Sequence, residues 1–117
     1  MNRIVHIALK VDDLEGATAF YQKIFGFRQV KTGRVRDHVS RHLSDGAIDL
    51  SLLKYDAGGE SCIHHFAVEV DDMEAAERQI RAYGCEIISG AGVLPVKFRA
   101  PGGTLCEIVP RGRYRAP

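Results

Sequence analysis

The chain has 117 residues and a formal net charge of +1, with 16 Lys and Arg against 15 Asp and Glu. This length fits one domain, and an apolar fraction of 45% is enough to form a hydrophobic core. Because the charges balance, the chain offers no electrostatic footprint for nucleic acid or an anionic membrane, and a small molecule is the expected partner.

An internal repeat organises the sequence. The segment Val5-His-Ile-Ala-Leu-Lys-Val-Asp-Asp-Leu14 matches His64-His-Phe-Ala-Val-Glu-Val-Asp-Asp-Met73 at an offset of 59 residues. Each segment alternates polar and apolar residues as a strand does, and each ends in an Asp-Asp pair suited to capping a following helix. The repeat therefore predicts a strand followed by a helix in each half.

Both expected helices have clear ends. The first runs from about Leu14 to Phe25 and stops at Gly26, and the second begins near Met73 and stops at Gly84. Apolar residues recur at three- and four-residue spacings in each, which gives one face for packing against a sheet. The repeat offset falls to 58 after the second helix, so that helix is one residue shorter.

Three strands are expected after each helix. They cover residues 27–31, 35–43 and 47–53 in the first half, and 86–89, 95–100 and 104–109 in the second. The pattern predicts an α+β fold of one domain, with two paired βαβββ modules at about 3–55 and 62–110 and a basic tail at 111–117. The modules are expected to form a curved mixed sheet around a concave metal or ligand cavity. The alternative is that a second subunit covers the concave face.

A histidine and an acid recur at equivalent places in the two halves. His6 lies on the face of the first strand opposite the helix-packing residues, and His65 takes that place in the second copy. Residues 48–50 (Ile-Asp-Leu) align with residues 106–108 (Cys-Glu-Ile), which sets a carboxylate over a carboxylate. Two buried acids with no matched Lys or Arg in those strands need a compensating cation. We therefore predict a divalent metal with an open coordination position, held by His6, Asp49, His65 and Glu107.

Taken singly, each of these residues is more often an ordinary polar group on a strand; their coincidence in both halves favours the metal. Other polar residues are weaker candidates. His64 has the helix-facing parity of a packing or interface residue, and His38 and His42 share a face expected to be solvated or intersubunit. Lys97 and Arg99 are suited to a substrate anion, on a side of the sheet that the sequence leaves open.

The three cysteines are too few and too irregularly spaced for a disulfide framework. Cys62, Cys85 and Cys106 form an odd number without a CxxC spacing, which is typical of free thiols in a reducing compartment. We expect Cys106 to be a buried core thiol and Cys62 to be exposed and more reactive. With no signal-peptide pattern and no apolar run of membrane-spanning length, a cytoplasmic protein is expected.

The strand–helix openings HIALKVDDLEGATAFYQKIFGF and HHFAVEVDDMEAAERQIRAYG, with AIDLSLL and PGGTLCEIV, resemble the vicinal oxygen chelate superfamily. The resemblance runs from Val5 to Pro110, and this superfamily includes glyoxalase I, methylmalonyl-CoA epimerase, extradiol dioxygenases and bleomycin-binding proteins. It implies metal ligands at His6, Asp49, His65 and Glu107. A longer Glu or Gln is usual at the second of these positions, and without it the site is a two-His, one-carboxylate facial triad.

The resemblance also implies a reaction class. One divalent ion per site, Zn, Ni, Co, Mn or Fe(II), would bind two vicinal oxygens of a small substrate. We favour a glyoxalase-like or epimerase-like isomerase or lyase in which Glu107, or a neighbouring acid, moves a proton beside a carbonyl. An Fe(II) extradiol-type dioxygenase and a non-catalytic small-molecule or antibiotic-binding protein are the alternatives. Relatives of this length usually pair, so a homodimer is expected.

Overall fold

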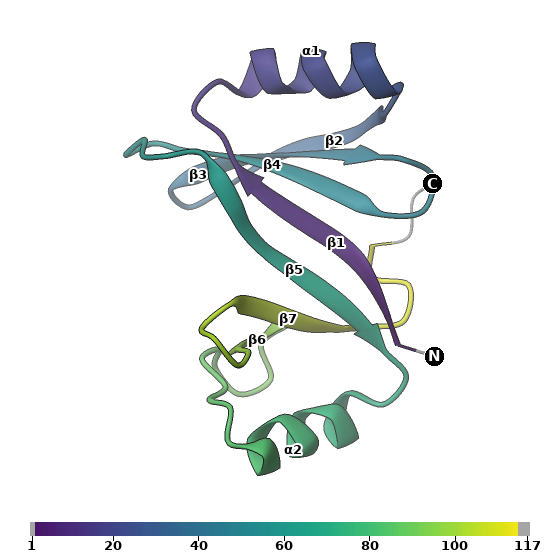
Figure 1. Cartoon of the computed structure of the whole chain (residues 1–117), viewed down its shortest axis with the longest axis vertical. Coiled ribbons are helices and arrows are strands. Elements are labelled where there is room, and N and C mark those ends of the chain that lie inside the picture. The colour runs from purple at the N-terminus through teal and green to yellow at the C-terminus, as the bar shows by residue number, and fades with distance from the viewer. Residues whose placement is uncertain (1, 115–117) are drawn as a thin grey trace. The chain divides into compact units, whose positions relative to one another are not determined.

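The computed structural model describes residues 2–114, so the last three residues of the predicted basic tail lie outside it. Its elements follow the chain in this order (Figure 1): β1 (Arg3–Lys10), α1 (Leu14–Phe25), β2 (Arg28–Val35), β3 (His38–Ser44), β4 (Asp49–Tyr55), β5 (Cys62–Val70), α2 (Met73–Tyr83), β6 (Val96–Arg99) and β7 (Leu105–Pro110). The fold is α+β with two βαβββ-type modules, as predicted. Neither described helix has the length and apolarity needed to cross a membrane.

Both helices begin and end at the predicted residues. The Asp13 side chain accepts a first-turn backbone N–H of α1 at 2.9 Å, and Asp72 does the same for α2 at 3.0 Å. Gly26 and Gly84 end the helices with φ of 71° and 106°, a left-handed conformation that glycine adopts without a Cβ clash. The second aspartate of each repeated Asp-Asp pair therefore acts as the N-cap.

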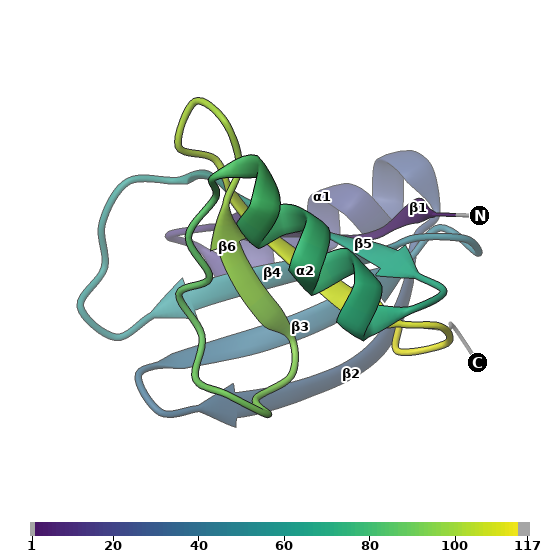
Figure 2. The same cartoon turned by 90° about the horizontal axis from the view of Figure 1, so that it is seen from below.

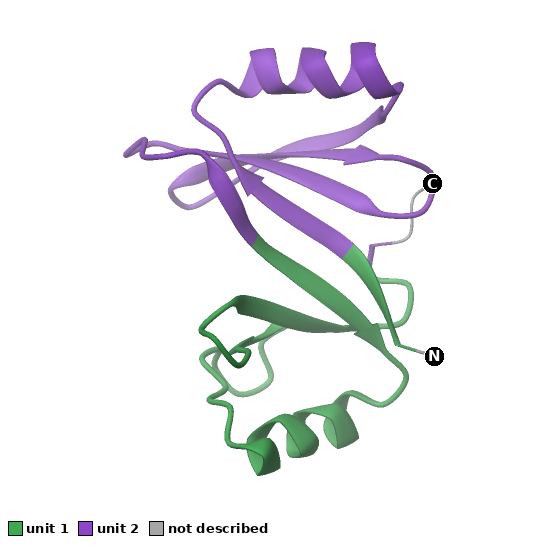
Figure 3. Cartoon of the chain, in the orientation of Figure 1, with its two compact units in different colours: residues 1–5, 65–113 green, residues 6–64, 114–117 purple. Residues whose placement is uncertain are grey.

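The described chain divides into two compact units, one of residues 2–5 and 65–113 and the other of residues 6–64 with Tyr114 (Figure 3). The strands β1 and β5 each contribute residues to both units, because the division falls after Val5 and after His64. Each unit thus contains one histidine and one acid of the predicted metal site.

In the unit of residues 6–64 the strand order is β2-β3-β4-β1, with β1 and β4 parallel and the other pairs antiparallel. The predicted start of the strand at 35–43 is wrong, because Val35 ends β2 and β3 begins at His38. The hairpin between β2 and β3 turns there, and Arg36 has a φ of 51°. Asp37 is the one turn-favouring residue between Val35 and His38, and no Gly, Pro or Asn accompanies it there, so the strand-like pattern runs through the turn.

In the unit of residues 65–113 the strand order is β5-β7-β6, with β5 parallel and β6 antiparallel to β7. The helix α2 lies over β7 (Figure 2). The apolar face of α2 packs on a hydrophobic core, and alternate residues of the strands point toward that core. That core contains Val70, Val96, Phe98, Cys106 and Ile108.

The strand expected at 86–89 is the second error. Only an isolated bridge between Ile87 and Phe98 forms there. The neighbouring β6 has four residues, and the Ser89 hydroxyl, not a backbone carbonyl, accepts the Lys97 backbone N–H at 2.9 Å. A side-chain acceptor in this place interrupts the backbone ladder that a strand requires.

Candidate functional site

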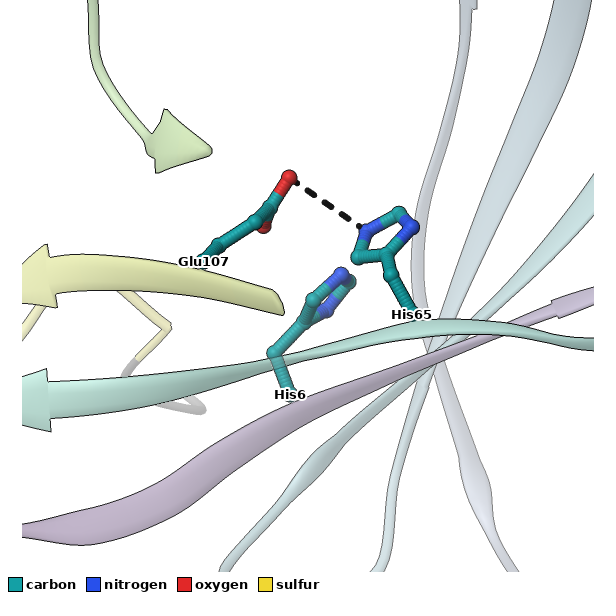
Figure 4. A group of neighbouring side chains, drawn as sticks. All are labelled: His6, His65 and Glu107. Atoms are coloured by element: carbon teal, nitrogen blue, oxygen red, sulfur yellow. Dashed lines mark ion pairs between the residues drawn. The ribbon is translucent and has the colours of Figure 1, made fainter. Parts of the chain in front are cut away.

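His65 and Glu107 lie on the neighbouring parallel strands β5 and β7. The Nε2 atom of His65 is 3.5 Å from Oε2 of Glu107, an ion pair drawn as a dashed line in Figure 4. Both side chains are buried, with 9% and 1% of their surface exposed. Cys106 and Ile108, on either side of Glu107, belong to the core beneath α2, so the alternation of β7 turns Glu107 to the opposite face as predicted.

Lys97, whose side of the sheet could not be predicted from the sequence, is a partner of Glu107. It is paired in register with Glu107 across β6 and β7, and its ammonium group forms an ion pair with Oε2 of Glu107. Arg99, two residues later, is exposed and donates to the Gly103 carbonyl at 3.3 Å. The expectation that the acid lacks a cationic partner was therefore wrong for Glu107, because it considered only the two last strands and the partner comes from β6.

The second oxygen of Glu107 is different. Oε1 is a buried acceptor with no hydrogen-bond partner among the residues that the structure describes. Buried polar atoms are nearly always paired, and an unpaired carboxylate oxygen carries a desolvation cost that a bound cation removes. The Glu107 carboxylate, with an imidazole beside it, thus fits a divalent metal ion.

The buried His6 and Asp49 form a chain with the half-buried His42 in the unit of residues 6–64. Oδ2 of Asp49 is 2.5 Å from Nδ1 of His6, and its two oxygens are 2.9 and 3.0 Å from Nδ1 of His42. The ring of Tyr114 stacks on the His6 imidazole, with 4.2 Å between centroids and 6° between planes. No pattern in the sequence pointed to Tyr114, and His42 was predicted only to share a strand face with His38, from which both could approach a substrate.

The Asp49 carboxyl has a pKa below its ordinary value. Burial raises this pKa and is the largest single influence, but hydrogen bonds from His42 and His6 and the charges of those rings together outweigh it. Asp49 is therefore an anion that accepts hydrogen bonds from two imidazoles.

The two units differ in the level of the acid along its strand. Ala8 and Ala67 correspond in the repeat; Ala8 is paired with Ser51, whereas Ala67 is paired with Glu107. By strand register Ser51 is therefore the counterpart of Glu107, and both are 1% exposed. The sequence repeat aligns Asp49 with Glu107, but by strand register Asp49 lies two residues before the position that corresponds to Glu107.

The remaining candidates have partners of their own. His38 lies 3.1 Å from Asp37 and 4.6 Å, ring to ring, from Tyr55, and the His64 ring is 5.9 Å from the same tyrosine. Cys106 is buried and Cys62 is exposed, as predicted. Burial raises the pKa of the Cys106 thiol to about 11.

Comparison with known proteins gives a consistent set of relatives. The model of the Glyoxalase/Bleomycin resistance protein/Dioxygenase superfamily matches residues 3–108. The mitochondrial methylmalonyl-CoA epimerase of Homo sapiens is 32% identical over 132 aligned positions, which cover 92% of this chain and 73% of that protein. The lactoylglutathione lyase of Haemophilus influenzae is 29% identical, over 81% of this chain and 76% of that enzyme.

Solved structures give the same fold. A variant of Streptomyces coelicolor methylmalonyl-CoA epimerase in complex with 2-nitronate-propionyl-CoA superposes with a TM-score of 0.75, 25% identity and 98% coverage of both chains. A hypothetical protein of Bacillus halodurans superposes with a TM-score of 0.78, 21% identity and 94% coverage of both chains.

Proposed function

The chain belongs to the Glyoxalase/Bleomycin resistance protein/Dioxygenase superfamily, and on that basis we propose that it is a divalent-metal-dependent isomerase or lyase acting beside a carbonyl of a small substrate. Its curated relatives are epimerases and lactoylglutathione lyases. The observation that carries the proposal is the buried Glu107 carboxylate, with one oxygen unpaired among the described residues and the other beside His65 and Lys97.

The proposed metal ligands are His6, His65 and Glu107, each of which offers one nitrogen or oxygen donor. This two-His, one-carboxylate set suits Zn, Ni, Co, Mn or Fe(II). When bound, such an ion polarises a substrate carbonyl as a Lewis acid. Asp49, the predicted fourth ligand, already accepts hydrogen bonds from two imidazoles.

Residues of the chain itself would move the proton. Glu107 is proposed to bind the metal through Oε1 and to exchange a proton with the carbon next to the carbonyl through Oε2, the oxygen that pairs with Lys97. Lys97 compensates the negative charge of Glu107, and its side chain is 40% exposed, which lets it also meet an anionic substrate. The proposed product is a stereoisomer or structural isomer of the substrate.

We propose a small acyl thioester as the substrate class. The support is the acyl-CoA analogue bound by the Streptomyces coelicolor epimerase. The alignment with the human epimerase spans 132 positions, more than the 117 residues of this chain, so that enzyme contains residues inserted relative to this one. A thioester without the nucleotide part of CoA belongs in the test as well, because it asks whether the acyl thioester group alone is enough for recognition.

The test is proton exchange in D2O, followed by NMR, for protein purified without chelator. Methylmalonyl-CoA, its pantetheine thioester and the hemithioacetal of methylglyoxal and glutathione are the substrates, and His65→Ala is the control. We expect exchange or isomerisation that EDTA abolishes and added Co(II) or Ni(II) restores. Oxygen uptake on catechols with bound iron would instead identify a dioxygenase, and a protein that binds no divalent ion would contradict the proposal. Light scattering tests the expected homodimer.

A further inference from the structure

Asp49 was expected to be a metal ligand, yet its surroundings are those of a hydrogen-bond acceptor. Its carboxylate is buried, with 9% of the residue exposed, and it lies between the imidazoles of His6 and His42. An ionised carboxylate can only accept hydrogen bonds, so each of these contacts requires a proton on Nδ1 of the imidazole. A neutral imidazole with its proton on Nδ1 has its lone pair on Nε2.

We propose that Asp49 is a positioning residue that holds His6 in the Nδ1-protonated tautomer, so that Nε2 is the metal-binding atom of His6. Metal-binding histidines commonly donate their other ring N–H to a carboxylate, which fixes both the tautomer and the direction of the ring. This inference rests on the proposed function, because it assigns Asp49 a part in the same metal site.

The strand register supports a role beside His6 and not one equivalent to that of Glu107. His6 and Asp49 are direct partners across β1 and β4, and a short Asp side chain at this level reaches Nδ1 of the adjacent imidazole. The position that corresponds to Glu107 is occupied by Ser51. Asp49 is thus placed to hold the ring of His6 and not to repeat the role of Glu107.

The ring of His6 is held from more than one side. Tyr114 stacks flat against it, which restricts its tilt, while Asp49 fixes its rotation about the Cβ–Cγ bond. His42 in turn holds Asp49, since its Nδ1 approaches both carboxylate oxygens, and its Nε2 is 3.4 Å from the Ser40 hydroxyl. The chain from Ser40 to His6 is a continuous hydrogen-bonded support for one imidazole.

The test is a long-range proton–nitrogen NMR spectrum of metal-free protein labelled with ¹⁵N-histidine, recorded above the titration range of imidazole. Loss of one signal set in His6→Gln assigns His6. In the wild type we expect His6 with its proton on Nδ1. In Asp49→Ala we expect a shift to the Nε2-protonated form that free histidine prefers, in Asp49→Asn an intermediate result, and in the exposed control Asp12→Asn no change. An unchanged His6 tautomer in folded Asp49→Ala would overturn this inference, whether or not metal binds.

Metal binding separates a positioning residue from a ligand. We expect Asp49→Ala to weaken Co(II) and Zn(II) binding by about 10- to 100-fold, with partial recovery in Asp49→Asn. The visible spectrum of the Co(II)-saturated variant should match the wild type, because no ligand has been removed. A changed coordination spectrum would make Asp49 a ligand and overturn the inference. Failure of the wild type to bind either ion, with the tautomer shift intact, would instead contradict the proposed function.

Discussion

In the unit of residues 6–64 the acid lies level with the histidine across a parallel strand pair, whereas in the unit of residues 65–113 it lies two residues farther along. The short Asp49 therefore contacts His6 directly at 2.5 Å, and the longer Glu107 approaches His65 at 3.5 Å. The third partner also differs, because β3 supplies an imidazole to one acid and β6 supplies an ammonium to the other. A repeat can thus keep the same residue types in both copies while the neighbouring strands change the roles of those residues.

The largest expected effect is on the acid with an unpaired oxygen. Glu107→Gln keeps the shape of the side chain and removes its charge, so metal affinity should fall by more than about 100-fold, beyond the usual cost of losing an outer partner of a ligand. Asp49→Asn is the matched change in the other unit, and it should lower the metal affinity by less. Equilibrium dialysis against Zn(II) measures both. Equal losses in the two variants would remove the distinction between the two acids.

The register difference can be tested by adding a carboxylate where the other unit has one. Ser51→Asp places an acid at the level that corresponds to Glu107, on a residue that is 1% exposed. Without metal the buried charge should lower the free energy of unfolding by roughly 1–3 kcal/mol, and Zn(II) should recover that loss. Urea unfolding with and without Zn(II) measures it. A stability loss that Zn(II) leaves unchanged would mean that residue 51 has no access to the metal.

The sequence predicted which residues lie on the polar faces of their strands better than it predicted how those strands pair. A period of two placed His6, His65 and Glu107 on the polar faces of their strands, because alternation is a local property of the backbone. The pairing of β1 with β4 depends on the chain between them, including the turn at Arg36. The repeat therefore aligned Asp49 with Glu107, although the structure pairs Ser51 with the equivalent alanine.

Lys97 shows a second limit of sequence reasoning. The strand that contains Lys97 follows a loop with Gly90 and Gly92. The backbone geometry of such a loop decides which residues of the next strand face each side of the sheet, and the local sequence pattern does not contain that geometry. Only the register with β7 sets Lys97 opposite Glu107. The helices were predictable throughout, because their caps and apolar faces are encoded within single segments.

Lys97→Met is a smaller test of the same contrast, since Asp49 has two imidazoles as partners whereas Glu107 has an ammonium group beside one imidazole. Removal of the ammonium takes one of two ion-pair partners from the buried Glu107 carboxylate and leaves only His65 beside Oε2. Because the Lys97 side chain is 40% exposed, the stability loss should be only about 1 kcal/mol. Zn(II) should stabilise this variant more than the wild type, as measured by thermal unfolding. Equal stabilisation of both proteins would show that the metal and Lys97 do not share Glu107.

The acid response of stability should report on Asp49. Its folded-state pKa is lowered, so the stability that it contributes is present above the ordinary pKa of 3.8 and is lost as the pH falls through the lower folded value. Asp49→Asn should therefore flatten the decline of unfolding free energy in this acid range. Urea unfolding at several pH values below about 5 measures the slope. An unchanged slope in the variant would assign the acid sensitivity to other carboxyls.

The smallest expected effect concerns the thiols, and it serves as a control for the Glu107 variants. Cys106 lies directly before Glu107 but faces the core beneath α2, and burial raises its pKa to about 11, whereas Cys62 is exposed at the start of β5. A thiol-disulfide reagent at pH 8 should modify Cys62 readily and leave Cys106 unmodified until the protein unfolds, because the thiolate is the reactive form. If Glu107→Gln leaves Cys106 protected, its loss of metal reflects the missing charge. Rapid modification of Cys106 in that variant would show instead that β7 has separated from α2, and the comparison between the two acids would then need a less disruptive substitution.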